Sequence, residues 1–131
     1  MRIGLVIAKY NRGITEQMEE EAEEAAEEKG VEIEKKYVPG TYDTPLAADR
    51  LARRDEIDAV AVLGAIIEGD TDHDKIIGHA TAKKLQDIAV DRDKPVTMGI
   101  TGPGMTAEEA KDRVHYAANA VDAAVEIEEI G

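Results

Sequence analysis

Short apolar runs alternate along the chain with longer stretches whose apolar residues recur at helical spacing. A run that is apolar at every position is typical of a strand covered on both faces, and residues 2–8 and 59–67 have this pattern. Residues 59–67 form the most apolar segment, which predicts a central strand. Residues 31–38 alternate between apolar and polar positions, as expected nearer a sheet edge, and residues 94–100 form a fourth predicted strand.

A helix is predicted after each of the first two strands. In the first, apolar residues recur at helical spacing before Gly30, which suits a C-terminal cap; they are Ile14, Met18, Ala22 and Ala25. Pro45 suits the first position of a second helix, which runs to about Arg54.

Two later helices begin at capping boxes, in which a Thr is followed three residues on by an acid. Thr71 and Asp74 predict a helix over about residues 72–90, and Thr106 and Glu109 open a last helix. The apolar face of this last helix consists of Ala110, Val114, Ala117, Val121 and Ala124. Strand and helix alternate four times, which indicates a single α/β domain over residues 1–131, with a parallel sheet covered by helices on both sides.

The composition narrows the functional classes. The 131 residues include no Cys, Phe or Trp, so the core must consist of Ile, Val, Leu and Ala, and disulfides and thiolate metal sites are excluded. The net charge of −13 argues against nucleic acid as a partner. Residues 15–30 carry eight Glu, interpreted as a solvated helix face. Because no apolar run approaches about 18 residues, we expect no membrane span and a cytoplasmic location.

Four segments follow the predicted strands and are expected to share one edge of the sheet. In open parallel sheets, ligands bind outside the carboxyl ends of the strands. The segments are KYNR (9–12), PGTYD (39–43), EGDTDH (68–73) and TGPGM (101–105). Three of them contain glycine, which lets a backbone approach a ligand closely. We therefore expect the four segments to converge on one pocket.

The acidic stretch IIEGDTDHD (66–74) raises the possibility of a metal site. Three alternating aspartates match the start of a calcium-binding loop, but Lys75 occupies the position of the obligatory glycine and Thr81 that of the closing glutamate. His73 and His79 are six residues apart and lie about 120° apart around a helix, so they cannot readily share an ion. The sequence therefore predicts no metal site.

Phosphate binding is the second interpretation of this stretch. Gly69, Asp70 and Thr71 lie where a helix begins, and free amide groups and the helix dipole favour an anion there. Every capped helix offers the same amides, so the pattern alone also fits an ordinary cap. His73 in the first turn is either a general acid–base or a structural surface histidine.

Three further residues have both a structural and a functional interpretation. Arg113 adjoins the apolar face of the last helix and is either the counter-charge for an anion or the partner of Glu109 in a surface ion pair. Tyr10 and Tyr42 are two of only four aromatic residues, and both lie in segments that follow strands. They either pack in the core or stack on a flat ring at a pocket mouth.

Motifs along the whole chain resemble those of the 6,7-dimethyl-8-ribityllumazine synthases, most closely the archaeal form. They are VIAKYNRGIT, VPGTYDTPLAADRL, LGAIIEGDTDHD, KPVTMGITGPGMT and AKDRVHYAANAVDAA. The most specific is the pattern G-x-x-I-x-G-x-T-x-H from Gly64 to His73. Archaeal riboflavin synthase is a distant relative of similar fold that lacks the T-x-H element, which disfavours it.

The resemblance implies a flavodoxin-like three-layer α/β/α sandwich with a four-stranded parallel sheet. It implies homopentamers, twelve of which close in some members into an icosahedral shell of sixty subunits. It further implies a cytoplasmic transferase without metal or cofactor. This enzyme condenses a ribitylamino-pyrimidinedione with 3,4-dihydroxy-2-butanone 4-phosphate to form the lumazine, releasing inorganic phosphate and water, in the penultimate step of riboflavin biosynthesis.

The resemblance also implies roles for individual residues. Tyr10 would stack on the pyrimidine ring, His73 would be the catalytic acid–base, and Met98 and Arg113 would come from the neighbouring subunit. The remaining substrate-binding residues implied are Asn11, Thr41, Tyr42, Asp43, Ala65, Ile66 and Ile67. The phosphate-binding residues implied are Gly69, Asp70, Thr71 and Arg113. Asn119 lies near a position where many members carry a basic residue.

A second functional class fits the same sequence. The Glu- and Ala-rich helices and the absence of Cys, Phe and Trp give it an idealised composition. An engineered lumazine-synthase-like scaffold, retained for self-assembly with little activity, would have these properties, and a halophilic or thermophilic enzyme would share part of them.

Overall fold

The computed structural model describes residues 1–68 and 73–130. Within these residues the elements follow the predicted alternation of strands and helices. In chain order they are β1 (Arg2–Ala8), α1 (Arg12–Lys29), β2 (Glu32–Val38), the 3₁₀ helix η1 (Thr41–Asp43), α2 (Thr44–Ala52), β3 (Ala59–Ile67), α3 (His73–Arg92), β4 (Val96–Met105), α4 (Ala107–Lys111) and α5 (Tyr116–Ile130).

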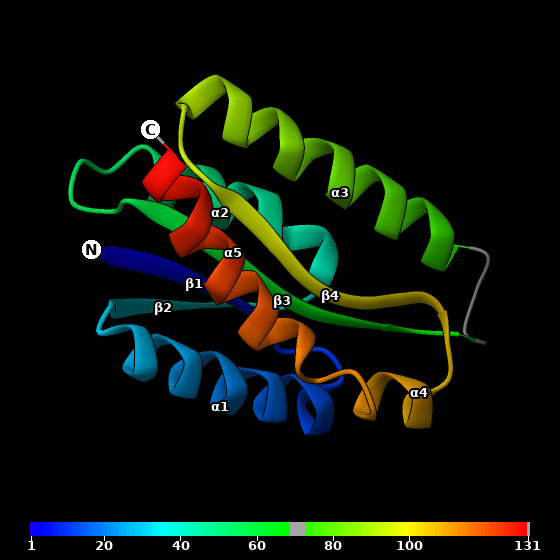
Figure 1. Cartoon of the computed structure of the whole chain (residues 1–131). Helices are drawn as coiled ribbons and strands as arrows, with labels where there is room; N and C mark the ends of the chain where they lie inside the picture. Colours follow the sequence, from blue (N-terminus) through cyan, green and yellow to red (C-terminus); the bar gives the residue numbers. More distant parts are fainter. Residues whose placement is uncertain (69–72, 131) are drawn as a thin grey trace.

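The four strands form an all-parallel sheet in the order β2-β1-β3-β4 (Figure 1). Helices α1 and α5 lie against one face and helices α2 and α3 against the other. The predicted fold class, a flavodoxin-like α/β sandwich with a four-stranded parallel sheet, is confirmed. Residues 59–67 are a central strand and residues 32–38 an edge strand, as their hydrophobic patterns indicated.

Two aliphatic cores lie on either side of the sheet. Because successive side chains of a strand point to opposite faces, β1 and β3 each supply residues to both cores. The largest fully buried members facing α1 and α5 are Ile3, Leu5, Ile7, Met18, Leu63 and Val121. Those facing α2 and α3 are Val6, Leu51, Ile57, Val60, Val62 and Leu85.

The structure corrects the predicted elements at the carboxyl side of the sheet. Strand β4 continues to Met105, so the TGPGM segment expected as a loop is an extension of the strand. The predicted last helix is two helices, because residues 112–115 form turns between α4 and α5. The capping box of Thr106 and Glu109 is present, with both hydrogen bonds at 3.2 Å. The capping box predicted for Thr71 lies outside the described residues.

A cluster of charged residues lies where α1 meets β2, beside the core that faces α1 and α5. The carboxylate of Glu19 is only 8% exposed and accepts hydrogen bonds from Arg12 at 2.7 Å and from the Tyr37 hydroxyl at 2.5 Å. The ammonium group of Lys35 lies 2.9 Å from the same carboxylate. Burial alone would raise the pKa of Glu19, but hydrogen bonds from Tyr37, Lys35 and Arg12 outweigh burial and lower it to about 2. Glu19 is therefore an exception to the solvated acidic face predicted for this helix.

Substitution of Glu19 by Gln tests this assignment through the pH dependence of stability. The folded-state pKa of Glu19, about 2, lies below its reference value of 4.5, so ionised Glu19 stabilises the fold above pH 4.5, and this contribution is lost as the pH falls toward 2. We expect Glu19→Gln to lower the melting temperature at neutral pH and the difference from the parent protein to narrow below pH 4.5. Thermal melts followed by circular dichroism would measure this, and a difference independent of pH would contradict the assignment.

Candidate active site

The segment after β1 and the segment after β2 run side by side. The backbone N–H of Lys9 donates to the Val38 carbonyl at 2.8 Å, and that of Tyr10 donates to the Pro39 carbonyl at 2.9 Å. These bonds continue the β1–β2 pairing beyond both strands. The Tyr10 side chain is 64% exposed, so it does not pack in the core, and it lies beside the segment that leads to η1.

Asn11 connects this segment to β3. Its backbone has a left-handed conformation, with φ of 62°, and its carbonyl accepts from the N–H groups of Ile14 and Thr15 at the start of α1. Its side-chain nitrogen donates to the Ala65 carbonyl at 2.9 Å. One N–H of the Asn11 side chain, which is expected to contact substrate, thus holds the β1 segment against the end of β3.

Thr41, Tyr42 and Asp43 have different environments although they are consecutive. Thr41 is 7% exposed and packs against Gly64 so closely that a Cβ at Gly64 would lie 2.6 Å from the Thr41 hydroxyl. Tyr42 is 69% exposed, and Asp43 is also exposed, with its carboxylate accepting from the Gly40 N–H at 3.0 Å. Of these three residues, Tyr42 and Asp43 therefore present their side chains to solvent, whereas Thr41 does not.

The end of β3 forms the floor between these segments. Ala65 and Ile66 are buried and Ile67 is half-buried. The extended end of β4 crosses close to them: a Cβ at Gly102, where φ is 89°, would lie 2.1 Å from the Ile66 carbonyl oxygen. Glycine is required at that position because the contact leaves no space for a side chain and the backbone is left-handed.

The acidic stretch after β3 is partly described. His73 is the first residue of α3 and is exposed. Its place at the start of α3 puts it at the carboxyl edge of the sheet, since α3 follows β3 directly along the chain. The three predicted phosphate-binding residues Gly69, Asp70 and Thr71 lie outside the described residues.

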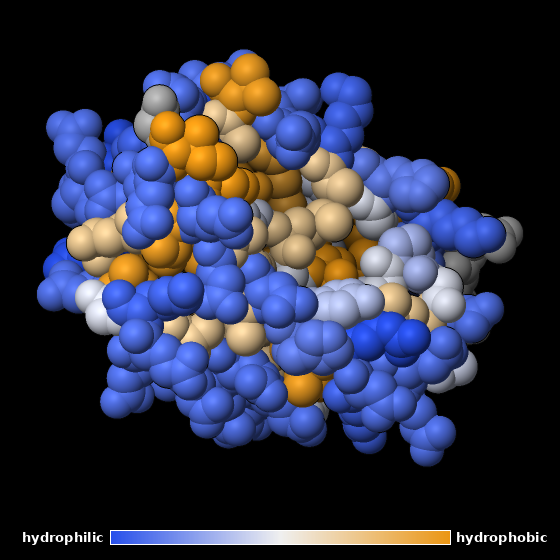
Figure 2. Space-filling model, viewed as in Figure 1, coloured by the Kyte–Doolittle hydropathy of each residue, from blue (hydrophilic) through white to orange (hydrophobic). Residues whose placement is uncertain are grey.

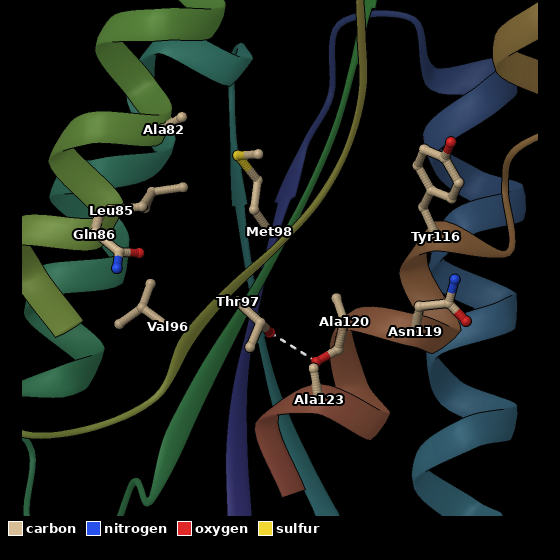
Figure 3. A pocket seen from close by; sticks show the side chains of 10 residues that line it. All are labelled: Ala82, Leu85, Gln86, Val96, Thr97, Met98, Tyr116, Asn119, Ala120 and Ala123. Carbon is tan, nitrogen blue, oxygen red and sulfur yellow. Dashed lines mark hydrogen bonds between the residues drawn. The ribbon is translucent and has the colours of Figure 1, made fainter. Parts of the chain in front are cut away.

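Met98 lies apart from this edge. It pairs with Val62 in the middle of β4, the strand at the open side of the sheet, and its side chain is 50% exposed. Figure 3 shows it between α3 and α5, in a hollow of about 540 Å³. The hollow is lined by Ala82, Leu85, Gln86, Val96, Thr97, Met98, Tyr116, Asn119, Ala120 and Ala123. Figure 2 shows apolar residues exposed between polar rims in the same region.

Arg113 lies in the turns between α4 and α5, one helical turn before Tyr116. Its guanidinium group donates to the backbone carbonyl of Glu109 at 2.8 Å, whereas the Glu109 carboxylate caps α4. Within residues 1–68 and 73–130 no salt bridge of Arg113 is found, although its charge still acts on the Glu109 carboxylate, whose pKa is lowered mainly by hydrogen bonds at Thr106 and to a smaller extent by Arg113. The Arg113 side chain is half-buried.

Gln86 and Tyr116 line the hollow but were not among the site residues predicted from the sequence. Tyr116 is the fourth aromatic residue of a chain with few aromatics, and it is the last residue of the AKDRVHY stretch, which was a usable signal. Gln86 carried no comparable signal, because a polar residue on a helix normally faces solvent. Both positions become relevant only through the packing of α3 and α5 around the open edge of β4.

The described residues show neither a metal-binding cluster nor a membrane-spanning helix. Residues 1–68 and 73–130 contain no cluster of three His, Asp or Glu side chains able to hold a metal ion. None of the helices described is both long and apolar enough to cross a membrane.

Together, the strand order and the covering helices define a flavodoxin-like α/β protein, a class in which ligands bind at the carboxyl edge of the sheet. The family model for 6,7-dimethyl-8-ribityllumazine synthase matches residues 1–130. The chain is 57% identical over 127 residues to the 6,7-dimethyl-8-ribityllumazine synthase of Halobacterium salinarum, covering 96% of each chain. It is 49% identical over 128 residues to that of Methanocaldococcus jannaschii, covering 97% of this chain and 91% of the relative. The chain belongs to the 6,7-dimethyl-8-ribityllumazine synthase family.

This likeness also bears on the alternative of an engineered scaffold. The relative from Halorubrum lacusprofundi is 54% identical over 126 residues, covering 95% of this chain and 94% of the relative. Similarity of this extent to enzymes of named organisms does not favour the scaffold.

The contact between Gly64 and Thr41 is directly testable. In Gly64→Ala the new methyl group would overlap the Thr41 hydroxyl, and we expect a destabilisation of about 1–3 kcal/mol. Thr41→Ala removes the overlapping atoms, so the double variant should cost less than the sum of the two single substitutions. Urea unfolding of the four proteins measures the coupling, and additive costs would show that Thr41 does not lie against Gly64.

Proposed function

We propose that this protein is a lumazine-forming transferase, acting as one domain. It would condense a 5-amino-6-ribitylamino-pyrimidinedione with 3,4-dihydroxy-2-butanone 4-phosphate to give 6,7-dimethyl-8-ribityllumazine, inorganic phosphate and water. One observation carries the proposal. The motifs that resemble the family's substrate-binding segments are far apart in sequence, and three of them meet at the carboxyl edge of the sheet, joined by hydrogen bonds at Tyr10 and Asn11.

The pyrimidine substrate would occupy the outer part of this edge. Tyr10 is exposed and has its backbone bonded on one side, which suits stacking on a flat ring. The buried end of β3, at Ala65–Ile67, would lie beneath the ring, and Tyr42 and Asp43 would contact the ribityl chain. Asn11 would hold this backbone through the N–H that it donates to Ala65, while its second N–H and its carbonyl oxygen could contact substrate.

The butanone phosphate would bind near the start of α3. Its phosphate group would accept hydrogen bonds from the backbone amides of Gly69–Thr71 and from the guanidinium group of Arg113. In a protein of net charge −13, Arg113 would supply the local positive charge that an anion requires. His73, exposed at the first turn of α3, would move protons as phosphate leaves and the ring closes.

The site requires two subunits in this proposal. Met98 lies at the open edge of the sheet, two strands away from β1, and it faces the hollow between α3 and α5. Tyr42 and Leu46 are exposed apolar residues on a different side of the chain, near η1 and α2. Burial of such surfaces favours association, and a head-to-tail arrangement would bring Met98 and Arg113 of one chain to the carboxyl edge of the next. We propose a cytoplasmic ring of five.

The activity is tested by mixing the protein with both substrates and following the absorbance of the lumazine. We expect turnover without added metal or cofactor. If His73 transfers protons, His73→Ala should lower kcat on the order of 10- to 1,000-fold with little change in melting temperature or assembly. His79→Ala, one to two turns further along the exposed side of α3, is the matched control and should retain activity. A loss of activity proportional to a loss of stability would support a structural role for His73.

The shared site is tested by subunit mixing. His73→Ala and Arg113→Ala should each be nearly inactive alone. If His73 and Arg113 of one site come from different chains, about a quarter of the interfaces in a random equal mixture pair an intact His73 with an intact Arg113. Activity should recover toward that fraction after the two variants are unfolded and reassembled together. No recovery in oligomers shown by mass spectrometry to be mixed would place both residues in one chain, and sedimentation would separate single pentamers from closed shells.

A further inference from the structure

The charged cluster between α1 and β2 is directly connected along the chain to the segment that carries Tyr10. Arg12 is the first residue of α1 and follows Tyr10 and Asn11 immediately. Tyr37 is the penultimate residue of β2 and immediately precedes Val38 and Pro39, whose carbonyls accept the N–H groups of Lys9 and Tyr10. The cluster thus lies at the base of both strand-end segments.

Three donors converge on one buried acceptor in this cluster. Arg12 donates to one oxygen of Glu19 at 2.7 Å, and Tyr37 and Lys35 approach the other at 2.5 Å and 2.9 Å. Lys35 is also bonded to Glu23, which lies one turn further along α1. Directional bonds from two elements to the same carboxylate allow one relative placement of α1 and β2, whereas an aliphatic contact would tolerate sliding.

Arg12 has a second contact with Tyr37. The central carbon of its guanidinium group lies 5.4 Å from the centre of the Tyr37 ring, within the range of a cation–π interaction. One of its terminal nitrogens, Nη1, is buried and has no hydrogen-bond partner among the described residues. An unpartnered buried donor is a cost, so the side chain is retained in this position by its contacts with Glu19 and Tyr37.

We propose that Arg12, Glu19 and Tyr37 form a positioning device that holds the Tyr10 segment in place for the pyrimidine substrate. This inference rests on the proposed function. None of the three residues contacts the substrate. Their effect is transmitted through the start of α1 and the end of β2 to the backbone of residues 9–11, and so to the exposed Tyr10 ring. Lys35 contributes charge to the cluster but lies farther from the segment.

The experiment combines kinetics with hydrogen exchange, both measured on the protein of residues 1–131. Arg12→Ala and Glu19→Gln should raise the KM of the pyrimidine substrate by about tenfold, with smaller changes in kcat and in the KM of butanone phosphate, because ring stacking is loosened equally in the ground and transition states. In the protein without substrate, the amides of Lys9 and Tyr10 should exchange about tenfold faster. A lower melting temperature is expected in either case, but a purely stabilising cluster would leave both KM values unchanged.

Conservative variants test the same contacts with less risk that the protein fails to fold. Arg12→Lys keeps the charge but loses the planar fork and its stacking on Tyr37, and Tyr37→Phe keeps the ring but loses one hydrogen bond to Glu19. Each should raise the pyrimidine KM less than Arg12→Ala does. Glu32→Gln is the matched control, because the Arg2–Glu32 pair joins β1 and β2 at the starts of the two strands, at the other end of the sheet from the Tyr10 segment. It should alter neither the KM nor the exchange of Lys9 and Tyr10.

The outcomes separate the two proposals. Unchanged exchange at Lys9 and Tyr10 in the Arg12 and Glu19 variants overturns the positioning role, whatever happens to stability. An equal effect of Glu32→Gln also overturns it. A parent protein that forms no lumazine overturns the proposed function instead, and the exchange measurement, which requires no substrate, still decides whether the cluster holds the Tyr10 segment.

Discussion

The coverage of β1 and β3 on both faces is the constraint on which the rest of the structure depends. A parallel sheet with two buried faces must be packed closely by helices from both sides, and this chain has no Phe or Trp with which to fill larger spaces. Short aliphatic side chains therefore leave the elements close together, and glycines lie where a side chain would collide. Gly64 against Thr41 and Gly102 against Ile66 are such contacts, and both help to shape the carboxyl edge.

The charges of the molecule serve two different purposes. Most of the acids on α1 are exposed, which gives the protein its strongly negative surface. Glu19 is buried instead and is held by Arg12, Lys35 and Tyr37. An isolated buried carboxylate would be protonated, but with three donors it remains ionised and fixes the position of its helix. The same helix thus combines a solvated face with one specific polar contact.

The distribution of the predicted site residues indicates why one chain alone would be insufficient for the proposed reaction. Tyr10, Tyr42 and His73 belong to the carboxyl edge, whereas Met98 faces a hollow at the open side of the sheet. The hollow is lined by aliphatic residues together with polar ones such as Gln86 and Asn119, and the Met98 side chain in it is half exposed. In the proposed head-to-tail arrangement, an association that covers the hollow would also supply the second wall of the site.

The sequence by itself determined the fold class, the edge and central strands and the family, because hydrophobic periodicity reports which faces are buried and the motifs span the chain. It did not indicate that Asn11 is bonded to Ala65, that Thr41 is buried against Gly64, or that residues 112–115 interrupt the last helix. The sequence also did not indicate the Arg12–Glu19–Tyr37 cluster or the hollow around Met98. Only the tertiary structure decided these features, since each depends on contacts between segments far apart in sequence, and a periodic pattern carries no information about which distant side chain a residue meets.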